Sequence, residues 1–243
     1  MSGARLDLDG VGKSFRGLRA VHDVSFAVPA GAIHALIGPN GAGKTTIFNM
    51  IAGVYAPDAG TVRLDGRAIS GLRPDRVCDA GVGRTFQLVK PFKGLSVLEN
   101  VTVGALHRTA DLARARDSAD AILSRLGLFE RRHQLAESLT LPDRKRLEVA
   151  RALATEPKLL LLDEVMAGLR PTEVDVMVGF LRELNGKTGL TILLIEHVMR
   201  AVMALAAEIV VVSYGEKIAE GTPQEIARHQ AVLDVYLGEP EAP

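Results

Sequence analysis

The stretch "GPNGAGKT", Gly38–Thr45, constrains this chain more than any other part of its 243 residues. It fits the pattern G-x-x-x-x-G-K-[ST] and stands between the apolar run "IHALI" and a helical segment from about Gly43 to Val54. Glycines let successive backbone N–H groups converge on phosphates, and the following helix presents its positive end to them. A plain glycine-rich turn is the alternative, but the strand–loop–helix context favours a nucleotide-phosphate site.

The residues of this loop have distinct expected roles. Lys44 would reach the β- and γ-phosphates, and the Thr45 hydroxyl would ligate Mg²⁺. We expect the nucleotide to be bound by Gly38, Pro39, Asn40, Gly41, Ala42, Gly43, Lys44, Thr45 and Thr46.

A second motif, "LLLLDE" at Leu159–Glu164, ends an apolar strand in two acids. Ligands bind at the carboxyl ends of strands in open α/β sheets, so Asp163 would hold Mg²⁺ there. Glu164 would polarise the attacking water. A strand that ends in Asp-Glu is common and by itself marks only a loop. Its combination with the phosphate loop favours the functional interpretation.

The periodicity along the chain predicts an α/β fold. The first part is β-rich, with alternating apolar residues in "VHDVSFAV", and almost everything from about Ser96 to Ala154 has helical character. Ser96 and Glu99 have capping-box spacing, and Pro142 begins a new helix. The all-apolar strands "KLLLLDE" and "LTILLIEH" indicate a sheet buried on both faces. Further expected elements are helices from Pro171 and over Val198–Ala206, a hairpin over Glu208–Gly221 and a capped helix from Thr222.

The composition excludes several classes of protein. The 29 basic and 29 acidic residues balance, which argues against a strongly electrostatic nucleic-acid surface. One cysteine, Cys78, rules out an internal disulfide and suits a reducing compartment. No apolar run approaches the roughly 20 residues that cross a bilayer. We therefore expect any membrane role to come through a partner.

These motifs together resemble a known family, the ATP-binding subunits of ABC transporters. The resemblance covers nearly the whole chain, from "VGKSFRGLRAVHDVSF" to "EKIAEGTPQEI". It implies an ATPase that uses ATP and Mg²⁺, and a P-loop NTPase core of mainly parallel sheet with an N-terminal antiparallel β subdomain. It also implies that residues 1–243 form a single ABC-type ATPase domain with a helical insert at roughly 90–155. An N-K-x-D guanine motif, which a GTPase would carry, is absent.

The resemblance assigns roles to further residues. Phe15 matches the aromatic that stacks on adenine, although it could instead be a core aromatic. Gln87 in "GRTFQ" matches the glutamine that contacts Mg²⁺ or the attacking water and senses the membrane partner. His197 in "LIEHVM" matches the histidine that contacts the γ-phosphate.

Within the family, the chain is most similar to the ATPases of branched-chain (hydrophobic) amino acid uptake systems, through "GPNGAGKTTIFNMIAG", "GVGRTFQ", "SVLENV" and "YGEKIAEGTP". This similarity implies permease subunits, a second ATPase subunit in a homo- or heterodimer and, indirectly, a periplasmic solute-binding protein. It places the chain at the cytoplasmic face of the inner membrane. The length and the ending "VYLGE" also resemble the lipopolysaccharide-export ATPase, which ranks second because "RTFQ" favours the uptake group.

One segment departs from the family pattern. Residues Leu139–Asp143, "LTLPD", stand where the family has L-S-G-G-Q, which closes over ATP bound to the other subunit. Thr140 retains a hydroxyl for the nucleotide, but Pro142 cannot donate a hydrogen bond, and Asp143 adds a negative charge near a phosphate. One lost hydrogen bond to a charged group is worth about 1.5–3 kcal/mol, or roughly tenfold to a hundredfold in affinity. The family's L-S-G-G-Q segment is called its signature, so Leu139–Asp143 is the signature segment of this chain. We expect this signature to bind nucleotide weakly, whereas the phosphate loop is complete. Arg170 in "AGLRP" also departs, because the family has an acidic or amide residue there.

Overall fold

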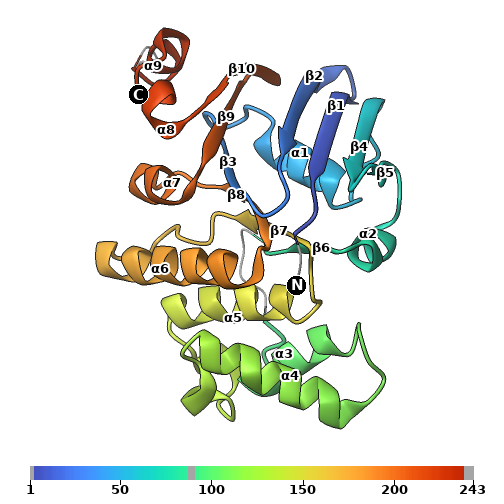
Figure 1. The fold of residues 1–243 in the computed structure, drawn as a ribbon, viewed down its shortest axis with the longest axis vertical. Helices are drawn as coiled ribbons and strands as arrows, with labels where there is room; N and C mark the ends of the chain where they lie inside the picture. The colour runs from blue at the N-terminus through green and yellow to red at the C-terminus, as the bar shows by residue number, and fades with distance from the viewer. Residues whose placement is uncertain (1–2, 87–90, 238–243) are drawn as a thin grey trace.

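The computed structural model describes residues 3–86 and 91–237, and its centre is a mainly parallel sheet (Figure 1). The strand order is β10-β9-β3-β8-β7-β6, and all neighbours run parallel except the antiparallel hairpin of β9 and β10. These strands are β3 (Ile33–Ile37), β6 (Val82–Arg84), β7 (Leu159–Asp163), β8 (Thr191–Ile195), β9 (Glu208–Ser213) and β10 (Glu216–Gly221). The expected P-loop NTPase core and the expected hairpin are therefore confirmed.

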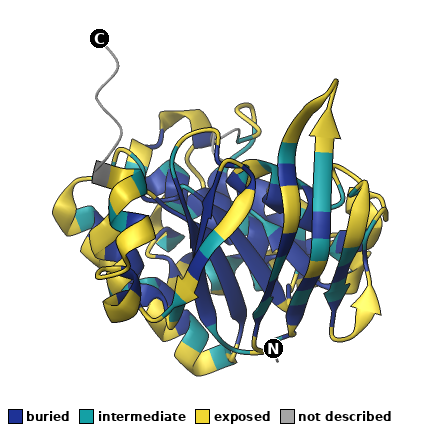
Figure 2. Ribbon diagram, turned by 90° about the horizontal axis from the view of Figure 1, so that it is seen from above, coloured by how far each residue is buried: buried dark blue, intermediate teal, exposed yellow. Residues whose placement is uncertain are grey.

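Strands β7 and β8 are buried on both faces because every position in them is apolar or lies at the strand end. Side chains alternate between the faces of a strand. In β7, Leu160 and Leu162 pack into one apolar cluster, and Leu159 and Leu161 pack into the other. Figure 2 shows these inner strands buried along their length, whereas exposed residues gather on the outer strands and helices.

A smaller antiparallel sheet forms the N-terminal part, as predicted. Its order is β2-β1-β4-β5, with β1 at Leu6–Phe15, β2 at Leu18–Val28, β4 at Ala59–Leu64 and β5 at Arg67–Ala68. Helix α1 (Lys44–Ile51) shares one apolar cluster with both sheets, through Ile47, Phe48 and Ile51.

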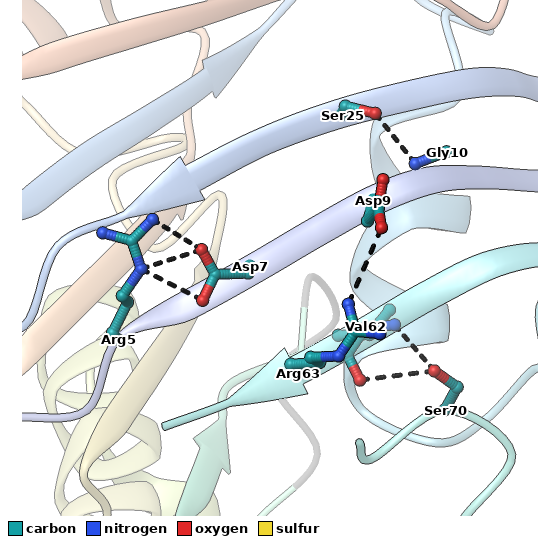
Figure 3. A network of polar contacts seen from close by, with 8 residues as sticks. All are labelled: Arg5, Asp7, Asp9, Gly10, Ser25, Val62, Arg63 and Ser70. Carbon is teal, nitrogen blue, oxygen red and sulfur yellow. Dashed lines mark hydrogen bonds and ion pairs between the residues drawn. The ribbon is translucent and has the colours of Figure 1, made fainter. Parts of the chain in front are cut away.

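Polar contacts lie within and between the strands of the smaller sheet and in the adjoining turn (Figure 3). The Arg5 guanidinium donates to the Asp7 carboxylate at 2.8 Å, and the Ser25 hydroxyl accepts from the Gly10 amide at 2.8 Å. The amide of Val62 donates to the Ser70 hydroxyl at 2.6 Å. Of these contacts, the one between Gly10 and Ser25 connects β1 to β2.

Helices cover the face of the central sheet opposite α1 and extend the molecule at one end (Figure 1). Helix α3 begins with the expected Ser96–Glu99 capping box, and α5 begins with Pro142 in its first turn. Short 3₁₀ turns at 129–131 and 136–138 interrupt the predicted helical stretch. The helices are α3 (Val97–Ala105), α4 (Leu112–Arg125), α5 (Leu141–Leu153), α6 (Pro171–Thr188), α7 (Met199–Leu205), α8 (Pro223–Ile226) and α9 (Gln230–Leu237).

Some elements were not predicted from the sequence, and two of them lie between β5 and α3. Helix α2 (Pro74–Ala80) is short, and β6 at Val82–Arg84 has only three residues, one of them glycine. Neither is long enough to display a clear period. Across residues 3–86 and 91–237, no helix combines the length and the apolar character needed to span a membrane.

Candidate nucleotide-binding and hydrolysis site

The phosphate loop connects β3 to α1 in the conformation that its glycines require. Gly41 and Gly43 have positive φ angles of 77° and 100°, where side chains are strained. A Cβ atom on Gly43 would also lie 2.5 Å from the Ala20 carbonyl oxygen. The two glycines therefore allow both the backbone path and its close approach to β2, and the loop opens at the N-terminus of α1.

Lys44 is held beneath this loop. Its side chain is buried, and Nζ donates to the carbonyl oxygens of Gly38 at 2.6 Å and Pro39 at 2.8 Å. Burial lowers the pKa of the ammonium group, and the charges of Glu164 and Asp163 act in the opposite direction. The cation is thus fixed inside the loop that is expected to receive phosphate.

A cavity of about 220 Å³ brings the loop together with two of the predicted catalytic residues, Glu164 and His197. Its lining consists of Ala20, Asn40, Gly41, Ala42, Gly43, Lys44, Thr45, Thr46, Glu164 and His197. The predicted site residues therefore converge from segments that lie far apart in the sequence.

Glu164 and His197 both line this cavity and are in direct contact with each other. The Glu164 Oε1 atom lies 3.1 Å from His197 Nε2. Glu164 has a positive φ of 50°, and its amide donates to the Ile195 carbonyl at 2.9 Å, which ties the turn after β7 to the end of β8. A non-glycine residue in this conformation is strained, so the surrounding contacts must hold it.

Asp163 ends β7 in a buried position and has a carboxylate oxygen to spare. Its Oδ2 accepts from Arg84 at 3.2 Å, whereas Oδ1 is buried and has no hydrogen-bond partner among the described residues. Burial raises the pKa of Asp163, and Arg84 acts against this rise. A carboxylate oxygen without a partner among the described residues suits Mg²⁺, which keeps several waters and takes few protein ligands.

Sequence reasoning missed the residues that orient Asp163. Arg84 bridges the Asn49 amide oxygen, at 2.6 Å, and the Asp163 carboxylate. The Thr85 hydroxyl accepts from the Asp163 amide at 3.0 Å. Both residues lie in "GRTFQ", so proximity to the predicted glutamine was the available signal. Gln87 itself lies outside the described residues.

Phe15 is not a core residue. Its side chain at the end of β1 is 37% exposed, which makes the alternative of a core aromatic wrong. The Tyr55 ring packs edge-on against it, with a centroid distance of 5.1 Å, and Lys13 Nζ lies 5.7 Å from the ring centre. Phe15 does not line the phosphate cavity, and it presents an aromatic surface to solvent.

Thr140 lies apart from the phosphate cavity, at the start of α5. Its hydroxyl donates to Asp143 Oδ2 at 2.7 Å. The Asp143 carboxylate is buried and also forms ion pairs with Arg131 and Arg146. The negative charge that we expected near a phosphate is therefore balanced within the chain, and the Thr140 hydroxyl is engaged locally.

Comparison with known proteins identifies the class to which this fold and site belong. The family model described as ABC transporter matches residues 21–167, and a model described as branched-chain amino acid ATP-binding cassette transporter matches residues 216–242. The chain belongs to the ABC transporter family and is an ATP-binding cassette, a nucleotide-binding ATPase.

The chain is also similar over nearly its whole length to individual members of this family. The high-affinity branched-chain amino acid transport ATP-binding protein LivG of Salmonella typhimurium is 41% identical, over 98% of this chain and all of LivG. The lipopolysaccharide export system ATP-binding protein LptB of Escherichia coli is 37% identical, over 97% of this chain and 98% of LptB. A crystal structure of a nucleotide-free ATP-binding cassette from an ABC transporter is 29% identical, with a TM-score of 0.89 over 97% of this chain and all of that one.

Proposed function

We propose that this ATPase is the energy-coupling subunit of a transporter that imports branched-chain or other hydrophobic amino acids or related amides. The full-length similarity to LivG supports this proposal, as does the C-terminal match to the branched-chain amino acid family model. Similarity to LptB, at a lower identity, leaves lipopolysaccharide-type export as the second candidate. Residues 1–243 would form one cassette domain, with a helical insert at roughly 90–155.

ATP would be bound with its phosphates on the loop Gly38–Thr46 and its adenine against Phe15. Lys44 would contact the β- and γ-phosphates. Thr45, Asp163 and Gln87 would hold Mg²⁺, which would neutralise the phosphate charge that grows during transfer.

Hydrolysis would then depend on Glu164 and His197. Glu164 would polarise the attacking water, and His197 would contact the γ-phosphate. The contact of 3.1 Å between the Glu164 carboxylate and the His197 ring carries this proposal, because it places both groups beside the phosphate loop. His197 would also hold the Glu164 carboxylate in its orientation.

The membrane partners would be permease subunits, with a periplasmic solute-binding protein acting through them, and the chain would sit at the cytoplasmic face of the inner membrane. A largely apolar cavity of about 280 Å³ beside β6 supports the binding of a protein partner, since Phe86 and Phe92 in its lining are 57% and 45% exposed. An apolar surface of this kind suits a protein partner rather than a nucleic acid.

A second ATPase subunit would complete each nucleotide site in a head-to-tail dimer. Pro142 and the engaged Thr140 hydroxyl make the signature of this chain weak. A heterodimer would therefore have one strong site, built from this phosphate loop and the signature of the partner, and one weak site. A homodimer would carry the weak signature twice.

The substitution Glu164→Gln tests the proposed hydrolytic role. It should retain ATP binding and slow hydrolysis about a hundredfold to ten-thousandfold, because the amide cannot act as a base. Sedimentation with and without ATP and Mg²⁺ would then reveal whether trapped ATP drives dimer formation. Glu183→Gln, at an exposed position on α6, is the matched control and should behave like the parent.

Hydrolysis by Glu164→Gln at the parent rate would contradict the role of Glu164. A variant that binds ATP but stays monomeric would instead indicate that Thr140–Asp143 no longer grip nucleotide in a homodimer. A different ATPase subunit would then be the required partner.

A further inference from the structure

Lys145 connects the helix of the signature segment to the peptide of Glu164. It lies on α5, five residues after Thr140, and its side chain is buried. Its Nζ donates to the main-chain carbonyl oxygen of Glu164 at 2.8 Å. A buried ammonium group is unfavourable unless it is paired and hydrogen-bonded, so this contact has a strong physical reason to persist.

Acidic groups surround this cation. Its charge opposes the effect of burial on three carboxyl groups and lowers the pKa of Glu148, Asp163 and Glu196 from where burial alone would put it. Asp163 and Glu196 lie at the carboxyl ends of β7 and β8, and Glu148 lies on α5 itself. Lys145 therefore stands where the expected catalytic edge of the sheet meets the signature helix.

The turn that carries Glu164 is fixed on three sides. The Glu164 amide donates to Ile195, and the Met166 amide donates to the Glu196 carboxylate at 2.8 Å. The Glu164 carbonyl accepts from Lys145. Because Glu164 has a strained positive φ, these contacts hold its peptide in place, and with it the Cα–Cβ bond from which the carboxylate extends.

We propose that Lys145 is a positioning residue for hydrolysis, which holds the Glu164 peptide so that the carboxylate faces the phosphate loop. A shift at the Thr140 end of α5 would reach Glu164 through this hydrogen bond. The inference rests on the proposed role of Glu164 and adds to it a physical link between the signature segment and the hydrolytic group.

The test compares Lys145→Met, which removes the donor, with Lys145→Arg, which keeps one. For Lys145→Met we expect kcat to fall about tenfold to a hundredfold, the effect of one lost hydrogen bond from a charged group. The Kd of ATP, measured without Mg²⁺, should stay within about twofold, because Lys145 does not line the phosphate cavity. Lys145→Arg should recover most of kcat, and the exposed Lys187→Met should match the parent.

A second comparison shows whether Lys145 acts through Glu164. In a Glu164→Gln background, single-turnover measurements should find no further loss from Lys145→Met, since residues that act as a unit are not additive. If Lys145→Met does not fold, Lys145→Leu, which also lacks a donor, is measured in its place and should give the same non-additive loss.

Three results would overturn the inference. One is a parent-like kcat for Lys145→Met while Glu164→Gln is slowed, which would leave the role of Glu164 intact. Another is a loss that adds fully to that of Glu164→Gln. The third is parent-like hydrolysis by Glu164→Gln itself, which would remove the proposed role of Glu164 and this inference with it.

Discussion

We predict that Glu196 makes the stability of the chain depend on pH and that a single substitution removes this dependence. The residue directly follows β8, and its side chain is 1% exposed. Its Oε1 accepts from the Met166 amide, whereas Oε2 has no hydrogen-bond partner among residues 3–86 and 91–237. Burial, assisted by the charge of Glu164, raises the pKa of Glu196 to about 7 from an ordinary 4.5.

This pKa determines the sign and the size of the change in the free energy of unfolding with pH. Below pH 4.5 the carboxyl group is protonated in both the folded and the unfolded chain. Between pH 4.5 and 7 the unfolded chain releases the proton and the folded chain keeps it, so the free energy of unfolding falls as pH rises. At about 1.36 kcal/mol per pH unit, the total loss is about 3 kcal/mol, all of it present above pH 7.

The substitution Glu196→Gln should abolish this loss, because the amide is neutral at every pH and its oxygen can still accept from Met166. We expect the variant to gain about 3 kcal/mol relative to the parent between pH 4.5 and 8. Urea unfolding of both proteins across this range measures the difference. The exposed Glu130→Gln is the control, and it should follow the parent.

The comparison of variant with parent cancels the titration of every group that does not interact with Glu196. A stability difference that is the same at pH 5 and pH 8, within about 0.5 kcal/mol, would refute the reasoning. It would mean that the buried carboxylate is ionised at little cost in the folded protein.

Two further predictions concern the nucleotide. Phe15→Ala should weaken ATP binding about fivefold to a hundredfold, the usual value of a base stacked on an aromatic ring, and titration with a fluorescent ATP analogue measures it; an unchanged Kd would exclude stacking. Leu141→Gly with Pro142→Gly should raise hydrolysis at the weak site, measured in a dimer in which Lys44→Ala silences the strong one; an unchanged rate would contradict the weak-signature hypothesis.

The sequence predicted those parts of the fold whose signals are local. "LLLLD" predicted a strand buried on both faces, and β7 has alternate leucines in two different apolar clusters. The spacing of Ser96 and Glu99 predicted a capping box that the structure contains. By contrast, β6 takes its strand conformation from pairing with β7, a partner far along the chain, so its own three residues carry no signal.

The same distinction holds at the candidate site. The phosphate loop and the Asp163–Glu164 pair are contiguous motifs, and their residue types alone indicate phosphate and metal binding. Arg84 meets Asp163 across 79 residues and Lys145 meets Glu164 across 19, and both contacts exist only once the sheet and α5 are assembled. Residue type alone could not distinguish the buried Lys145 from its more exposed neighbours Arg144 and Arg146.

The signature segment shows how a local contact changes the meaning of a substitution. From the sequence, Asp143 would repel an approaching phosphate. In the structure, Arg131 and Arg146 balance its charge, so repulsion is reduced. From the sequence, the Thr140 hydroxyl is expected to contact the nucleotide. In the structure it donates to Asp143 at 2.7 Å. We therefore expect a phosphate to compete with Asp143 for that hydroxyl, and we predict a weak signature from this competition together with the missing N–H of Pro142.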